Sequence, residues 1–169
     1  MMKRCLVLGI GNRLMMDDGI GIYMVEALQK QYGEEIRQGD QVTKLVIGES
    51  DLDYCVDQVL QATLFIIVDA AQLGKKPGEV TLIPFHQLSS LSLHHSAHDL
   101  HLFHLLQVME QVEQQEIAGY LLGIEPYEIR FHWGLSDRLQ DQIPMMLEEI
   151  KTILVTLGVP ESDLGKYKN

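Results

Sequence analysis

Two adjacent carboxylates, Asp17 and Asp18, follow a short apolar run and a glycine-rich turn near the start of the chain. A third, Asp69, ends an apolar run at residues 65–68 that holds no other polar residue. A carboxylate in such a place must be paired, hydrated or bound to a metal, because burying an isolated charge is costly. The alternative is structural, since acidic residues also cap helices and loops by accepting backbone N–H groups. Both interpretations stay open at this point.

Histidines cluster in the middle of the chain. Six of them lie within a short stretch, at His86, His94, His95, His98, His101 and His104. His94 and His98 are four residues apart, so a helix here would align their imidazoles. Histidine together with carboxylates suits a divalent transition metal such as nickel, zinc or cobalt. For five of the six, a position on the surface of an amphipathic helix is the preferred explanation, and no HExxH motif of a helix-borne zinc protease is present.

The glycines of the first turn superficially match a dinucleotide-binding loop. Gly9, Gly11, Gly19 and Gly21 surround the two aspartates, but the spacing after Gly11 does not fit GxGxxG. Two aspartates would also repel a pyrophosphate placed at this turn. The sequence therefore disfavours a nucleotide site, and it contains no GxSxG motif, Walker loop or Cys/His nucleophile arrangement.

Alternating strand and helix patterns position these residues. Apolar runs predict strands at residues 5–9, 42–47, 64–68, 79–83 and 119–124, and helical periodicity predicts helices at 19–31, 51–60, 97–113 and 136–157. The loop at 72–78 is too short for a parallel crossover, so the strand at 79–83 is expected to be antiparallel. Pro144 is expected to kink the last helix or to split off its first turn. The pattern predicts an α/β fold with three layers, and the first turn then lies at the carboxyl edge of the sheet, where open α/β proteins bind ligands.

Composition narrows the class of protein. The 169 residues suit one domain, expected at residues 1–160, followed by a polar tail at 161–169. A net charge of −11 argues against binding to nucleic acid or to an anionic membrane. Cys5 and Cys55 form no CxxC pair, which indicates buried thiols rather than a zinc or redox site. The sequence contains no long apolar stretch and no signal-peptide pattern, so we expect a cytoplasmic protein.

Four segments, in order, resemble the maturation endopeptidases of nickel–iron hydrogenases. Residues 9–21 read GIGNRLMMDDGIG and are similar to the family's opening GxGNxLxxDDGxG. Residues 68–78 read VDAAQLGKKPG, and residues 96–102 read SAHDLHL, similar to its VDAxxxGxxPG and SxHxxxL segments. Residues 123–126, GIEP, and 134–136, GLS, resemble its last conserved region. The resemblance extends over nearly the whole chain.

The resemblance implies a three-layer α/β/α, phosphorylase/hydrolase-like domain whose five-stranded mixed sheet has its fourth strand antiparallel. It also implies an endopeptidase that removes the C-terminal extension of the hydrogenase large-subunit precursor after nickel insertion. By position in the motifs, the metal-binding and catalytic residues would be Asp18, Asp69 and His98, and Asp17 would keep a capping or supporting role. The metal would be nickel carried by the substrate, with zinc or cadmium as possible substitutes in vitro.

One departure from the family pattern, and two other functions, remain open. The family commonly has a GGT-like turn after the second strand, whereas this chain has Gly48-Glu49-Ser50, with an extra negative charge near the expected site. A non-catalytic, nickel-sensing chaperone on the same fold would bind the precursor without cutting it. A metal-dependent aminopeptidase-like hydrolase would cut short free peptides, but it requires more metal ligands than these motifs supply.

Overall fold

The computed structural model describes residues 2–91, 97–113 and 118–159; at residues 97–100 and 113 only the backbone is described. Six strands form one sheet: β1 (Lys3–Ile10), β2 (Glu35–Gln38), β3 (Gln41–Glu49), β4 (Leu64–Ala70), β5 (Val80–Pro84) and β6 (Gly119–Ile124). The four α-helices are α1 (Ile20–Tyr32), α2 (Leu52–Leu60), α3 (Ala97–Glu113) and α4 (Asp137–Thr156). Two 3-10 turns, η1 (Met16–Gly19) and η2 (Phe85–Ser90), complete the described secondary structure.

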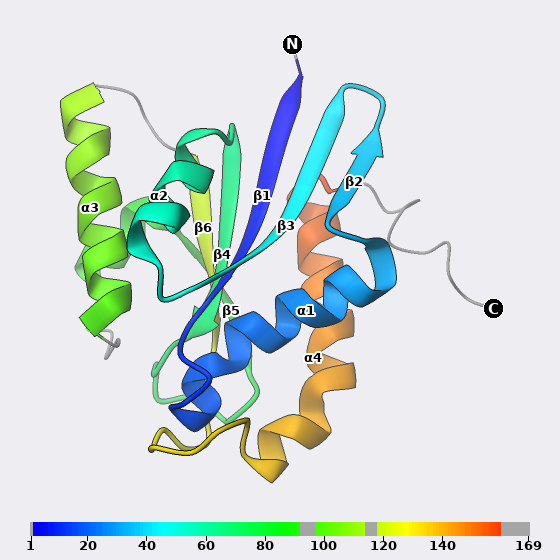
Figure 1. Ribbon diagram of the computed structural model, residues 1–169, viewed down its shortest axis with the longest axis vertical. Coiled ribbons are helices and arrows are strands. Elements are labelled where there is room, and N and C mark those ends of the chain that lie inside the picture. Colours follow the sequence, from blue (N-terminus) through cyan, green and yellow to red (C-terminus); the bar gives the residue numbers. More distant parts are fainter. Residues whose placement is uncertain (1, 92–96, 114–117, 160–169) are drawn as a thin grey trace.

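The strand order is β2-β3-β1-β4-β6-β5 (Figure 1). The central strands β3, β1, β4 and β6 are parallel, whereas β5 is antiparallel to β6, as the short loop before it predicts. The predicted mixed α/β class is confirmed, but the expected count of five strands is wrong. The additional strand, β2, is antiparallel to β3 at the edge of the sheet. Only Ile36 is buried in this four-residue strand, so it carries no apolar run that could reveal it in the sequence.

Helices cover both faces of the sheet and enclose two apolar cores (Figure 1). On one face, α1 and α4 pack on the sheet through Met24, Leu28, Met146 and Ile150. On the other face, α2, η2 and α3 contribute Val59, Phe85 and Leu106. The helix α4 runs through Pro144 as one assigned helix, so the proline does not split off its first turn. Within the described residues, no helix is both long and apolar enough to span a membrane.

The parallel strands determine where the candidate residues lie. Gly9 of β1 is level with Val68 of β4, so the turn after β1 and the end of β4 meet at one edge of the sheet. The turn η1 contacts β4 directly. The carboxylates that follow β1 and end β4 are therefore neighbours in the fold although about fifty residues of chain separate them.

Candidate active site

The turn after β1 is shaped by tight backbone contacts. Gly11 has a φ of 139°, and a Cβ at this position would lie 2.1 Å from the carbonyl oxygen of Asp18. Met16, which begins η1, has a φ of 51°, a left-handed conformation that is uncommon for residues with a side chain. The chain therefore doubles back on itself between β1 and α1 and carries Asp17 and Asp18 inward.

Two other glycines of the motif allow α1 to pack closely on the sheet. A Cβ on Gly21 would lie 2.0 Å from the carbonyl oxygen of Val68, and one on Gly9 would lie 2.6 Å from that of Gly21. A larger residue at either position would push the helix away from β1 and β4. These glycines therefore allow the close packing of α1 on β1 and β4.

Asp17 binds the loop that precedes α4. Its side chain is fully buried and accepts four hydrogen bonds. Oδ2 accepts from the backbone N of Tyr127 at 3.0 Å and of Glu128 at 2.9 Å, and from the Ser136 hydroxyl at 2.8 Å. Oδ1 accepts from the backbone N of Ser136 at 2.7 Å. Asp17 thus has the structural role that the sequence suggests, but the role is long-range: neither η1 nor α1 has a side-chain cap at its N-terminus.

Asp18 and Asp69 are buried carboxylates at the same edge of the sheet. Asp18 is 5% exposed, and its Oδ2 accepts a hydrogen bond from the backbone N of Asn12 at 3.0 Å. Asp69, fully buried near the end of β4, accepts at Oδ1 from the backbone N of Ala70 at 2.8 Å. A backbone N–H therefore orients one oxygen of each carboxylate. Two acids held in this way can bind a cation or exchange a proton with a substrate at the edge.

The candidate histidines fall into different parts of the chain. The backbone of His98 lies in the first turn of α3, and Figure 1 shows that α3 begins at the end of the molecule where the β1–α1 turn lies. The side chain of His98, and the residues His94 and His95, lie outside the described parts. His101 and His104 are exposed on α3, which is the surface position that the sequence predicts for them. Among the described side chains, no three His, Cys, Asp or Glu residues come together as a metal site.

Arg13 lies in the turn after β1 and contacts Glu49, the residue that departs from the family pattern. Its guanidinium forms a paired contact with Glu26 on α1, at 2.6 and 3.1 Å, and lies 5.1 Å from the centre of the Tyr23 ring. The hydrogen bonds that Arg13 donates to Glu26 raise the pKa of its guanidinium above the usual range. Glu49 lies 3.5 Å from the same guanidinium, and its backbone carbonyl accepts from the N of Gly11 at 3.1 Å. The extra charge of Glu49 is thus close to a cation rather than isolated at the edge.

Sequence reasoning did not assign a role to Glu125. This buried residue of the GIEP segment accepts at Oε2 from the backbone N of Leu73 at 2.7 Å. Its backbone carbonyl accepts from Gly78 at 2.8 Å, and its own N–H donates to Glu79 at 3.0 Å. Glu125 therefore fixes the loop that follows β4 and Asp69. The only feature of the sequence that pointed to this residue is its position, since it is a charged residue directly after the apolar strand β6.

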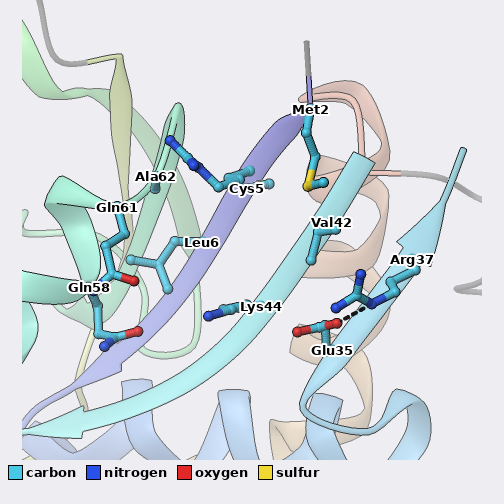
Figure 2. A pocket seen from close by; sticks show the side chains of 11 residues that line it. Met2, Cys5, Leu6, Glu35, Arg37, Val42, Lys44, Gln58, Gln61 and Ala62 are labelled. Carbon is cyan, nitrogen blue, oxygen red and sulfur yellow. Dashed lines mark ion pairs between the residues drawn. The ribbon is translucent and has the colours of Figure 1, made fainter. Parts of the chain in front are cut away.

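A hollow of about 290 Å³ lies at the opposite end of the sheet (Figure 2). Arg4 of β1 and Lys44 of β3 line it, with the Arg37–Glu35 ion pair of β2 on one side. Gln58 of α2 and Gln61, directly after this helix, lie on the other side. Because these residues surround the amino ends of β1 and β3, the hollow contains none of the candidate site residues.

Comparisons with known proteins show the family to which the chain belongs. The family model described as hydrogenase maturation protease matches residues 22–153. The chain belongs to the hydrogenase maturation protease family. It is 30% identical over 158 residues to the hydrogenase 2 maturation protease of Escherichia coli strain K12, covering 92% of this chain and 93% of that protein. It is also 30% identical over 161 residues to the hydrogenase expression/formation protein HoxM of Azotobacter vinelandii, with coverages of 91% and 73%.

The fold agrees as well. The hydrogenase maturating endopeptidase HybD from E. coli superposes with a TM-score of 0.74 at 27% identity, covering 95% of this chain and 99% of that one. The expectation of an endopeptidase that processes the hydrogenase large subunit is therefore confirmed. The chaperone and aminopeptidase-like alternatives gain no support from the family.

Proposed function

We propose that this hydrogenase maturation protease cuts the C-terminal extension from a nickel–iron large-subunit precursor after nickel insertion, at a site formed by Asp18, Asp69 and His98. The observation that carries the proposal is the placement of Asp18 and Asp69 as buried carboxylates at one sheet edge. Asp17 is fully engaged with the loop before α4, and Asp18 makes no helix cap. In this proposal the chemistry is assigned to Asp18 because it lies buried at the same sheet edge as Asp69.

Two carboxylates with an imidazole form a donor set that suits a divalent transition metal. The placement of the His98 backbone in the first turn of α3, at the end of the molecule that holds the β1–α1 turn, supports its inclusion. In this proposal the metal is the nickel of the precursor and belongs to the substrate. Zinc or cadmium would occupy the same donors in vitro. Recognition of nickel would then restrict cutting to loaded precursors.

Two routes for peptide cleavage follow from the same residues. In the first, the substrate's nickel polarises the scissile carbonyl and activates water. In the second, one carboxylate takes a proton from the attacking water and passes it to the leaving amine, while nickel only aligns the precursor. Both routes need an ionised acid at the edge. The reaction would take place in the cytoplasm, and the buried, reduced thiols of Cys5 and Cys55 are consistent with a reducing compartment.

The test is the cleavage of nickel-loaded precursor by the Asp69→Asn, Asp18→Asn and His98→Ala variants, followed by the intact mass of the large subunit. We expect loss of the C-terminal peptide with the wild type and no processing with each variant. The matched control is Asp57→Asn, which makes the same change from carboxylate to amide at an exposed position on α2; this variant should cut normally. Unchanged cleavage by folded Asp69→Asn would overturn the site assignment. A wild type that binds precursor without any mass loss would instead indicate the chaperone.

The second measurement compares nickel-free and nickel-loaded precursors. If the site recognises nickel, the wild type should cut only the nickel-loaded precursor. Equal cutting of both forms would contradict nickel recognition. The assignment of Asp18, Asp69 and His98 to the site would still be tested by the variants above. Cleavage of short free peptides would point to the aminopeptidase-like alternative.

A further inference from the structure

Large apolar side chains are exposed on the loops beside the candidate site. Leu14 lies in the turn after β1, and Tyr127, Ile129, Phe131 and Trp133 lie in the loop between β6 and α4. Phe131 is 78% exposed and Trp133 is 67% exposed. Aromatic side chains with this exposure are typical of protein interaction surfaces. We call these five residues the apolar platform.

The backbone of the platform is held in place by the turn after β1. His132 forms an isolated β-bridge with Met15, donating to the carbonyl of Leu14 at 2.9 Å and accepting from the N of Met16 at 3.0 Å. The N of Gly134 donates to the carbonyl of Arg13 at 3.1 Å. Together with the four bonds to Asp17, these contacts order the loop before any partner arrives. A preordered aromatic surface loses little conformational entropy on binding.

The platform and the candidate site share one short segment. Asp17 anchors the loop between β6 and α4, and the next residue, Asp18, is the proposed metal ligand. Figure 1 shows this loop at the same end of the molecule as the β1–α1 turn. A substrate whose scissile peptide reaches Asp18 and Asp69 therefore meets the platform at the border of the site.

Polar groups surround the exposed aromatic rings. Arg130 pairs with Glu128 at 2.8 Å, and the guanidinium of Arg138 lies 4.3 Å from the centre of the Tyr127 ring. An apolar centre with a polar rim is the usual composition of a specific protein interface. A second copy of this chain is the less favoured occupant, because each copy carries a net charge of −11 and two copies repel.

We infer that the apolar platform docks an apolar patch on the folded body of the large-subunit precursor, beside the extension that is cut. This inference rests on the proposed function, because it takes the precursor as substrate. The platform binds the precursor and takes no part in the bond-breaking step. Its loss should therefore raise KM, while kcat for the bound precursor stays close to that of the wild type.

Trp133 makes the docking directly observable because it is the single tryptophan of the chain. Protease made with 5-fluorotryptophan carries one ¹⁹F resonance, whatever tryptophans the unlabelled precursor contains. With the inactive Asp69→Asn variant, we expect this resonance to shift or broaden when nickel-loaded precursor is added. An unchanged resonance at a precursor concentration that saturates binding would overturn the platform assignment.

The steady-state kinetics of precursor cleavage provide a second test of the platform. The double change Phe131→Ser with Trp133→Ser should raise KM for precursor about tenfold or more, the size expected for two central aromatic contacts. The matched control is Val112→Ser, which removes a 73% exposed apolar side chain near the end of α3 and should leave KM unchanged. Equal KM values for the double variant and the wild type would contradict the inference.

The outcomes separate this inference from the proposed function. If Asp69→Asn still cuts but the double variant loses affinity, the site assignment fails and the platform stands. If Asp69→Asn is inactive and the double variant behaves like the wild type, the platform fails alone. A ¹⁹F resonance that changes with protease concentration before precursor is added, together with a dimer mass in sedimentation, would assign the platform to a second copy of the chain and overturn the inference.

Discussion

Asp17 and Ser136 are 119 residues apart in the chain and share two hydrogen bonds in the buried interior. The Ser136 hydroxyl that donates to Asp17 also accepts from the backbone N of Leu139 at 3.3 Å and so caps α4. A single buried contact therefore connects the turn after β1 with the start of the last helix. It also fixes the loop that carries the apolar platform.

Replacement of Asp17 by Asn should destabilise the fold strongly. An amide has one acceptor oxygen, and its NH₂ group would face backbone and hydroxyl donors that the carboxylate now satisfies. Because unpaired buried donors cost about 1–3 kcal/mol each, we expect the free energy of unfolding to fall by about 3 kcal/mol or more. Urea unfolding followed by circular dichroism measures this change.

The control for that experiment is Asp57→Asn, which alters an exposed carboxylate on α2 that accepts a hydrogen bond of 2.9 Å from the side chain of Gln61. It should change the free energy of unfolding by less than about 0.5 kcal/mol. Similar losses for the two variants would show that Asp17 does not hold the loop as its hydrogen bonds indicate.

Glu49 has a backbone conformation that favours glycine. Its φ is 51°, in the left-handed region, where a side chain costs roughly 1–2 kcal/mol. Its carboxylate is 59% exposed and 3.5 Å from Arg13, so the ion pair contributes little to stability. We expect Glu49→Gly to be more stable than Glu49→Ala by about 1 kcal/mol, after part of the gain is lost to the flexibility of glycine in the unfolded chain.

Both variants of Glu49 remove the carboxylate, so their difference isolates the backbone effect. Thermal unfolding of the two proteins side by side provides the comparison. A Glu49→Ala variant as stable as Glu49→Gly would mean that the turn relaxes and that the left-handed conformation carries no cost.

Cys5 should make the fold sensitive to alkaline pH. Burial raises the pKa of its thiol from 9.0 to about 11, against a smaller lowering effect of the Thr43 hydroxyl. The folded state therefore keeps its proton more tightly than the unfolded state does. The resulting stability is complete below pH 9 and is lost as the pH rises from about 9 to about 11, by about 2 kcal/mol in total.

Urea unfolding at pH 8, 10 and 11 measures this loss in the wild type and in Cys5→Ala. The variant is expected to be less stable at pH 8 because it leaves a small cavity. Its decline above pH 9 should nevertheless be shallower by about 2 kcal/mol, since the thiol is gone. Parallel declines in the two proteins would assign the alkaline sensitivity to other groups.

Much of the fold was predictable from local patterns. The buried strands β1 and β4 are uninterrupted apolar runs, and Gly33, with a φ of 79°, ends α1 where the periodicity ends. The antiparallel direction of β5 followed from the length of the loop before it. The strand β2 was missed because it is stabilised by pairing with β3 at the edge of the sheet and not by burial of its own side chains.

The sequence by itself determined the fold class, the motifs and the edge of the sheet where Asp18 and Asp69 lie, because strand direction and apolar periodicity are encoded locally. The resemblance implies a supporting role for Asp17, but only the tertiary structure shows which groups Asp17 binds. Adjacent residues have the same local sequence context, and the four donors that engage Asp17 come from a loop more than a hundred residues away. The same holds for Trp133 and Phe131, since the exposure of an aromatic ring depends on how distant segments pack around it.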